Sequence, residues 1–236
     1  MTLIENIKLT FEKHFSKTAE VFIVLTLGFG LFIYNSTSVI INNKISVTTQ
    51  TYNSFDFIFI IIYEIITMTI IASFLKKRNW TLKDFNLDFT LKMIGVAILL
   101  VVLREMIGAI LLQILYSLSI YNKTIDKSLI LIQSNIFSTG LIVIVNSIYE
   151  EVLLTGYLFK RFEKYHPLVI IIFSFIIRAS YHTYQGWTKL PMVFIMALVF
   201  GVYYIKFKKL WPIIIAHGIG NIFHFLNIHY QWINTM

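Results

Sequence analysis

The sequence predicts an all-α, polytopic membrane protein with about seven transmembrane helices that enclose a polar intramembrane cavity. Three observations lead to this fold class. Hydrophobic residues make up 57% of the 236 residues and charged residues only 14%, whereas a soluble domain carries about a quarter. The apolar residues fall into long runs, and the basic residues lie between these runs in an alternating pattern. A few polar side chains interrupt the later runs and indicate the cavity.

Polar connections separate the first three predicted spans. They cover 19–42, 55–75 and 91–119, each long enough for the roughly 20 residues that a spanning helix needs. Four further spans follow with short connections. These are 129–158, 168–185, 190–206 and 210–228.

With only 3 prolines and 10 glycines, the chain has little room for linkers, so residues 1–236 are predicted to form a single integral membrane domain. There are no cysteines, which excludes disulfides, thiolate metal sites, a cysteine nucleophile and a prenyl acceptor on this chain. The first 18 residues are polar and amphipathic, so we expect no cleavable signal peptide.

Lysine and arginine alternate between rich and poor connections along the chain. Because basic residues favour the cytoplasmic side, this pattern predicts a multi-pass protein of the cell membrane with a cytoplasmic amino terminus and an external carboxyl terminus. The net charge of +8 is spread over these short connections, which favours membrane lipids and argues against nucleic acid as a partner. The rich group comprises Lys8, Lys13, Lys17, Lys76, Lys77, Arg78, Lys83, Lys160, Arg161, Lys164, Lys206, Lys208 and Lys209, and the poor group Lys44, Lys123, Lys127 and Lys189.

Two adjacent glutamates, Glu150 and Glu151, lie inside the fourth span. A charged side chain at the bilayer centre costs roughly 2.5–3.5 kcal/mol even on the lenient insertion scale. Helical spacing places Ser147 and Thr155 on the face of Glu151, and Asn146 on the face of Glu150. Such a pair could be structural, bonded to a neighbouring helix. Adjacent carboxylates repel each other, however, so the pair is better suited to act as a general base or proton shuttle than to hold helices together.

Imidazole and amide side chains occupy the later spans. His182 follows Arg178 by one helical turn, and Asn221 follows His217 by the same spacing. A lone buried histidine is more often a satisfied core residue. A histidine and an asparagine on one face, in contrast, can together bind a water molecule or an oxyanion. Three other charged residues, Glu64, Arg104 and Glu105, lie within predicted spans. We favour pairing of these residues with one another over a position in the lining of the cavity.

These residues resemble the three motifs of the CAAX protease and bacteriocin-processing family, also called the Abi family of intramembrane metalloproteases. The resemblance covers the core 129–228, and its motifs appear in the family's order in successive spans. The family patterns are Glu-Glu-x-x-x-Arg, Phe-x-x-x-His, and His-x-x-x-Asn or Asp. Here they read Glu150-Glu151-x-x-x-Thr155, Arg178-x-x-x-His182 and His217-x-x-x-Asn221.

The resemblance implies an intramembrane metallopeptidase with a cavity open to the cytoplasm or the bilayer. By carry-over, Glu150 is the general base that activates water and Glu151 supports it. His182 helps to hold the water or a metal, while His217 and Asn221 hold the oxyanion. A tentative site for zinc or another divalent metal comprises Glu150, His182 and His217, because two imidazoles and a carboxylate leave a coordination position open.

Two positions depart from the family pattern. Thr155 stands where the first motif has arginine, and Arg178 stands where the second has phenylalanine. One positive charge is thus missing from one helix and present on the next. We expect Arg178 to replace the missing arginine as counterion of the carboxylate pair, since an arginine without a partner is costly in a membrane. The other interpretation is a degenerate site, with Arg178 extending toward an interface.

Three functions are consistent with the residues. The leading one is glutamate-dependent cleavage of a membrane-associated peptide or protein, in bacteriocin processing or self-immunity as the resemblance implies. The alternative is a non-catalytic membrane scaffold or immunity protein with a degenerate protease site, which the threonine at position 155 favours. A proton-coupled transporter is the least favoured, because the sequence has no inverted repeat and no pair of Gly/Pro-broken helices.

Overall fold

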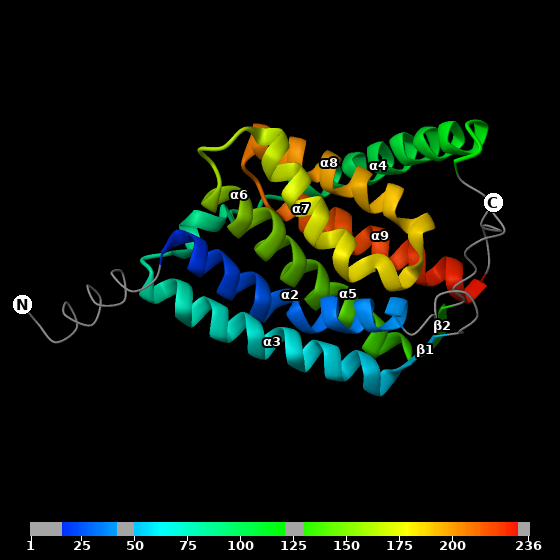
Figure 1. Ribbon diagram of the computed structural model, residues 1–236, viewed down its shortest axis with the longest axis horizontal. Helices are drawn as coiled ribbons and strands as arrows, with labels where there is room; N and C mark the ends of the chain where they lie inside the picture. Colours follow the sequence, from blue (N-terminus) through cyan, green and yellow to red (C-terminus); the bar gives the residue numbers. More distant parts are fainter. Residues whose placement is uncertain (1–15, 42–49, 121–129, 231–236) are drawn as a thin grey trace, which may run out of the picture.

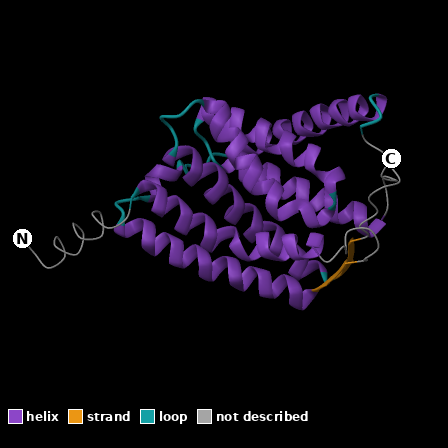
Figure 2. Ribbon diagram, in the orientation of Figure 1, coloured by secondary structure: helices purple, strands orange, loops and turns teal. Residues whose placement is uncertain are grey.

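The computed structural model describes residues 16–41, 50–120 and 130–230. Figure 2 shows that these residues are almost entirely helical, which confirms the predicted all-α membrane fold. Its helices are α2 (Lys17–Ile41), α3 (Ser54–Lys77), α4 (Lys92–Ser117), α5 (Ile136–Glu151), α6 (Leu158–Arg161), α7 (Pro167–His182), α8 (Leu190–Phe207) and α9 (Trp211–Tyr230). Between them lie the short elements η2 (Leu82–Phe85), η3 (Val152–Tyr157), η4 (Thr183–Gln185) and η5 (Trp187–Lys189), and the strands β1 (Gln50–Asn53) and β2 (Ile130–Gln133).

Six helical segments of the described chain are long and apolar enough to cross a membrane. The fourth of them, Ile136–Arg161, runs continuously through α5, η3 and α6. The seventh predicted span corresponds to α9, whose apolar stretch Trp211–Leu226 is shorter than the other six. The sequence therefore predicted every membrane helix, and the structure differs at the start of the fourth, where β2 precedes a helix that begins only at Ile136.

The bundle surrounds α5, which contributes both glutamates. In Figure 1, α2 and α3 run along one side of α5, and α7, α8 and α9 lie on the other. Helix α4 packs against α8 and α9 at the edge of the bundle. Helix α5 thus has protein on both of these sides, so polar side chains there can avoid lipid.

The helix starts are fixed by local capping. Asn53 and Asp56 form a capping box at the start of α3, and the Asn135 side chain accepts a hydrogen bond from the Ser138 backbone N–H at the start of α5. The parallel pair β1–β2, absent from the prediction, holds these two starts together. Helices α3 and α5 consequently run in the same direction, as the alternating charges require.

The connection between α3 and α4 contains η2. Asp84 caps this turn by accepting hydrogen bonds of 2.8 Å from both the backbone N–H and the hydroxyl of Thr81. Burial raises the pKa of Asp84, but these hydrogen bonds outweigh burial and hold the pKa below its usual value. The Trp211 indole donates to the Leu87 carbonyl at 2.8 Å, so the start of α9 is tied to this connection.

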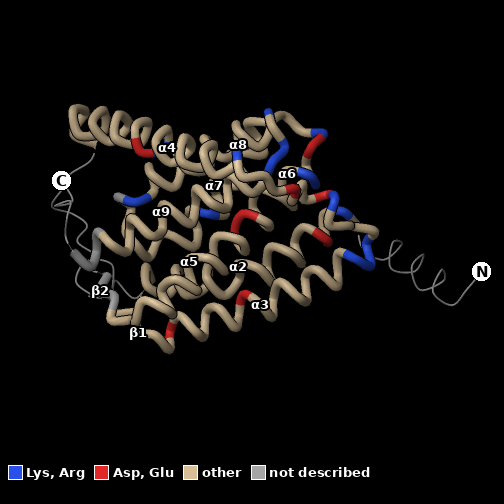
Figure 3. The backbone as a smooth tube through the Cα atoms, turned by 180° about the vertical axis from the view of Figure 1, so that it is seen from behind, with Lys and Arg blue, Asp and Glu red and all other residues tan. Residues whose placement is uncertain are grey.

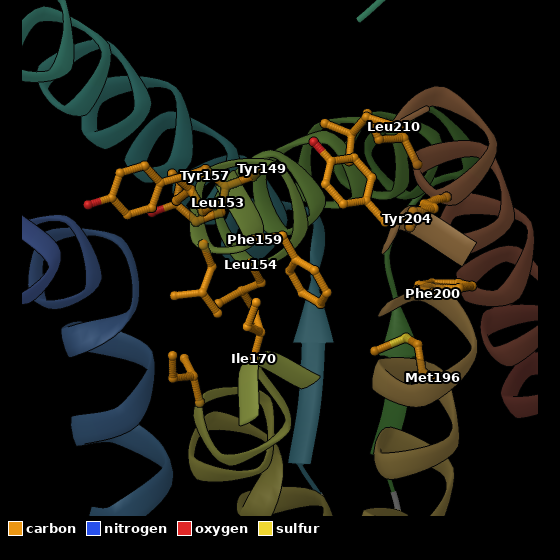
Figure 4. Packing of buried hydrophobic residues seen from close by; sticks show 14 of the residues in the cluster. Tyr149, Leu153, Leu154, Tyr157, Phe159, Ile170, Met196, Phe200, Tyr204 and Leu210 are labelled. Atoms are coloured by element: carbon orange, nitrogen blue, oxygen red, sulfur yellow. The ribbon is translucent and has the colours of Figure 1, made fainter. Parts of the chain in front are cut away.

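A π-helical segment, η3, follows the glutamate pair directly. Single π-helical turns within α-helices occur frequently at functional sites. Gly156 in this segment allows a close approach, since a Cβ there would lie 3.1 Å from Leu210 and 3.2 Å from Phe85. Figure 4 shows the apolar packing around this region, with Tyr149, Leu153 and Leu154 beside Phe159 and Ile170.

The two ends of the bundle differ in charge. Figure 3 shows lysine and arginine gathered at the end from which the amino-terminal trace leaves, where the connections after α3, α6 and α8 meet. At this end Glu20 is fully buried and pairs with Arg78 at 2.8 Å and Arg161 at 2.5 Å. The opposite end carries β1, β2 and η5. Lys8, Lys13, Lys44, Lys123 and Lys127 lie outside the described residues.

Candidate active site

Arg178 is the centre of the polar cluster inside the bundle. Its guanidinium is fully buried and contacts both adjacent glutamates, with Nη1 at 3.3 Å from Glu150 Oε2 and Nη2 at 2.7 Å from Glu151 Oε2. The expected ion pairs between Arg178 and the carboxylates are thus present. One cation shared by two adjacent anions reduces their mutual repulsion and offsets part of the cost of burying them.

Glu151 is fully buried and bonded on both oxygens. Its Oε2 accepts hydrogen bonds from Arg178 and, at 2.7 Å, from the Thr155 hydroxyl one turn later. Its Oε1 lies 2.7 Å from Nδ1 of His217 on α9. Glu151 therefore joins three helical segments and fixes the orientation of the His217 ring, leaving Nε2 of that ring for other partners.

Glu150 faces the other way and lines a cavity. Its Oε2 accepts hydrogen bonds from Arg178 and from the hydroxyl of Tyr181, whose ring stacks on Phe29. Its Oε1 accepts a longer bond, 3.3 Å, from the Asn146 side chain. The carboxylate is 5% exposed. Oε1 is therefore the oxygen that remains accessible to a water molecule or a substrate in the cavity.

The cavity has a volume of about 590 Å³ and contains four of the five predicted catalytic residues: Glu150, His182, His217 and Asn221. His182 Nδ1 is buried and has no hydrogen-bond partner among the described residues, so it is available to a bound group. Glu151 contacts His217 from behind the cavity wall. The structure thus brings the five residues together from α5, α7 and α9, while their roles stay proposals.

The predicted polar stripes on α5 are confirmed. Thr155 bonds Glu151, and Asn146 bonds Glu150, each across four residues. His217 lies six residues after the start of α9, and His182 lies 15 residues after the start of α7, so the two would differ in depth if both helices began at one level. Leu210, which directly precedes α9, packs closely on Gly156, and Gly156 lies five residues before the end of α6 at Arg161. Helix α9 therefore begins deeper in the bundle than the point at which α6 ends. All three motifs therefore reach one cavity although their helices begin at different levels.

Sequence reasoning missed three groups at the site. Tyr181, which immediately precedes His182, binds Glu150, and Tyr184 and Gln185 of η4 line the cavity. The sequence signal was weak, because tyrosine is common at membrane interfaces. Mutual pairing was predicted for Glu64, Arg104 and Glu105. Arg104 does pair with its neighbour Glu105, but Glu64 lines the cavity.

The tentative metal ligands do not form a donor set in this arrangement. Within residues 16–41, 50–120 and 130–230, no group of three or more His, Cys, Asp or Glu side chains is placed to hold an ion. Glu151, rather than Glu150, contacts His217. The guanidinium of Arg178 beside both carboxylates would also repel a divalent cation. The residues as placed do not fit a metal, and we derive no step through one.

The site can be compared with known proteins. Residues 132–223 match the family model described as type II CAAX prenyl endopeptidase, Rce1-like. Curated proteins and solved structures give no match. The matched stretch contains all three motifs, from the glutamate pair through His182 to Asn221, and the structure gathers them at one intramembrane cavity. Residues 132–223 are therefore similar to the Rce1-like family of type II CAAX prenyl endopeptidases.

Proposed function

We propose that the protein is an intramembrane endopeptidase that hydrolyses a peptide bond of a membrane-associated peptide or protein by glutamate-activated water. One observation carries the proposal: Glu150, His182, His217 and Asn221 line a single cavity inside the helical bundle. The family match supports a protease at the level of reaction class. Bacteriocin processing or self-immunity is the biological setting that we propose for it.

The first step is attack of water on the substrate carbonyl. Glu150 Oε1 accepts a proton from the water, and the unpartnered Nδ1 of His182 helps to position that water. The oxygen–carbon bond forms, and the negative charge moves to the carbonyl oxygen. The proton held by Glu150 then passes to the leaving nitrogen as the carbon–nitrogen bond breaks. Arg178 and Tyr181 hold the carboxylate in place throughout.

The oxyanion faces His217 and Asn221. The Asn221 amide is a hydrogen-bond donor, and the His217 ring has a second nitrogen, Nε2, that can face the oxyanion. Glu151 Oε1, 2.7 Å from Nδ1, fixes the orientation of that ring. This assigns the two adjacent glutamates different tasks: Glu150 moves a proton, and Glu151 orients His217.

The test is cleavage of a peptide library by the purified full-length protein, followed by mass spectrometry. Wild type is compared with Glu150→Gln and with Glu163→Gln, a control at an exposed glutamate that pairs only with Lys160 among the described residues. We expect cleavage by wild type and the control, and none by Glu150→Gln. Cleavage by no form, in well-folded protein, would favour the non-catalytic scaffold.

A further inference from the structure

Glu64 of α3 is a second carboxylate in the cavity, and it lies outside residues 132–223. Its side chain is fully buried, and Oε1 accepts a 2.7 Å hydrogen bond from the Asn146 side chain. Its other oxygen, Oε2, has no hydrogen-bond partner among the described residues. A buried carboxylate oxygen without a donor is costly. The buried position of Glu64 is explained if a bound group donates a hydrogen bond to Oε2.

The cavity wall, in the part of the chain that the structure describes, offers no lysine or arginine to Glu64, and the basic side chains that line it are the histidines His182, His217 and His224. Its charged lining residues are Asp56, Glu64 and Glu150, with neither lysine nor arginine among the described residues that form the wall. Arg178 lies behind that wall and forms ion pairs with Glu150 and Glu151. The cavity is therefore electronegative, and a cation is the ligand that complements it.

The amide of Asn146 links Glu64 to the proposed general base. Its Nδ2 lies 2.7 Å from Glu64 Oε1 and 3.3 Å from Glu150 Oε1. A group bound at Glu64 Oε2 consequently lies close to the carboxylate that activates water. This is the arrangement expected of a residue that selects one substrate side chain near the bond to be cleaved.

Apolar side chains flank the route to Glu64. Ile60 and Phe57 precede it on the same face of α3, at one and two helical turns, and Phe57 packs with Ile142 of α5. A lysine or arginine side chain has an aliphatic stem that packs on such a wall and a charged head that reaches beyond it. An inorganic cation would gain nothing from these contacts.

The cavity extends from Glu150 toward the lysine-poor end of the bundle. Its lining includes Thr51 and Tyr52 of β1 and Asp56 at the start of α3, all at the end opposite the basic connections. Glu150 lies 14 residues from the start of α5, or about 21 Å along the helix at 1.5 Å per residue. Asp56 thus places a carboxylate at the mouth, and Glu64 places another farther in.

We propose that this cavity takes a basic residue of the peptide substrate from the lysine-poor end, and that Glu64 is the specificity-determining residue that binds its charge. The inference rests on the proposed peptidase function, since it assigns the substrate class of the same site. It goes beyond the family match, because Glu64, Asp56 and β1 lie outside the matched residues.

The probe is a set of synthetic peptide pairs that differ only by lysine or norleucine at one position, scanned along each peptide. Norleucine keeps the apolar stem and removes the charge. Wild type, Glu64→Gln and the control Glu163→Gln are compared by kcat/KM. We expect wild type and the control to favour the lysine peptide at one position by at least about thirtyfold, the loss typical of removing one partner of a buried charge pair. Glu64→Gln should abolish that preference while still cleaving the norleucine peptide.

Two results would overturn the inference. One is cleavage by wild type without a preference for lysine, and the other is a Glu64→Gln variant that keeps the preference. Either result would overturn only the role of Glu64 and would not contradict the proposed peptidase activity. If no form cleaves, the peptidase proposal fails, and binding of the same peptide pairs to the protein still decides the role of Glu64. Tighter binding of lysine peptides that Glu64→Gln removes supports it, and equal binding refutes it.

Discussion

Arg178 on α7 lies beside Thr155 on the π-helical segment, with Nη2 at 3.4 Å from the Thr155 hydroxyl and 2.7 Å from Glu151 Oε2. The two positions at which the chain departs from the family motifs are therefore neighbours in space, although they lie on different helices. The Arg178 guanidinium contacts the carboxylate pair, and the Thr155 hydroxyl lies 2.7 Å from Glu151, so we expect an arginine at position 155 to reach the same pair. We therefore interpret the two departures as the transfer of one positive charge from position 155 to position 178. This interpretation argues against a degenerate site that has lost its function.

The relocation predicts that the charge can be moved back. Arg178→Phe leaves two buried carboxylates without their cation, and we expect a loss of about 3–5 kcal/mol in the free energy of unfolding together with loss of cleavage. Adding Thr155→Arg to that variant restores the family's arrangement and should recover much of both. Thermal unfolding in detergent and the peptide assay measure the two effects.

Thr155→Arg alone provides the control for this exchange. It places a second guanidinium beside Arg178 and removes the Thr155 hydroxyl from Glu151, so it should be less stable than wild type. Arg178→Phe with normal yield, stability and cleavage would contradict the role of Arg178 as counterion. A double variant no better than Arg178→Phe would show that the two positions are not interchangeable.

The adjacent glutamates should respond differently to the same substitution. Glu150→Gln keeps an oxygen acceptor for Tyr181 and Arg178 but cannot take a proton, so cleavage should fall by about 10²–10⁴ with little change in stability. Glu151→Gln weakens fully buried contacts to Arg178, Thr155 and His217, so it should lower stability as well as cleavage. Equal effects of both substitutions on stability would contradict this division of tasks.

Much of the fold could be predicted from the sequence because membrane helices are encoded locally. Apolar length identified every membrane helix, and the four-residue spacing placed Asn146 with Glu150 and Thr155 with Glu151. The β1–β2 pair was missed because its strands are only four residues long and lie far apart in the chain. The π-helical turn at 152–157 was missed because it depends on packing, including the contact of Leu210 with Gly156.

The sequence predicted the members of the site whose side chains are unusual within a membrane helix. It did not predict which of these side chains contact one another. Two adjacent glutamates and an arginine in apolar helices identified the cluster. Nothing in the sequence decided which glutamate would bind His217, or that Glu64 would face Glu150 rather than Arg104. Those choices depend on how α3 and α9 are rotated against α5, and helix rotation is a property of the packed bundle.

Removal of metal provides a further test of the mechanism. Because the Arg178 guanidinium already pairs with both carboxylates, we expect cleavage to persist unchanged after treatment with EDTA or 1,10-phenanthroline. Metal content is measured on the same preparations, so that incomplete removal is recognised. Loss of cleavage that zinc restores would instead assign Glu150, His182 and His217 as a ligand set that assembles with the ion.

The orientation in the membrane can be tested with single cysteines, since the chain contains none. Thr51 is exposed at the mouth of the cavity, and Asp88 is exposed near the opposite, basic end. The positive-inside pattern predicts that Asp88 lies on the cytoplasmic side. A membrane-impermeant maleimide should therefore label Thr51→Cys in intact cells, and should label Asp88→Cys only after permeabilisation.

This labelling also decides where substrates come from. If Thr51→Cys reacts from outside, the acidic cavity receives basic peptides from the external side, after their translocation. The reverse labelling would contradict the positive-inside orientation and make the same cavity face the cytoplasm, where it would receive newly made peptides. In either case the distance between the mouth and Glu150 is fixed by α5, so the peptide must extend into the bundle before its bond meets the general base.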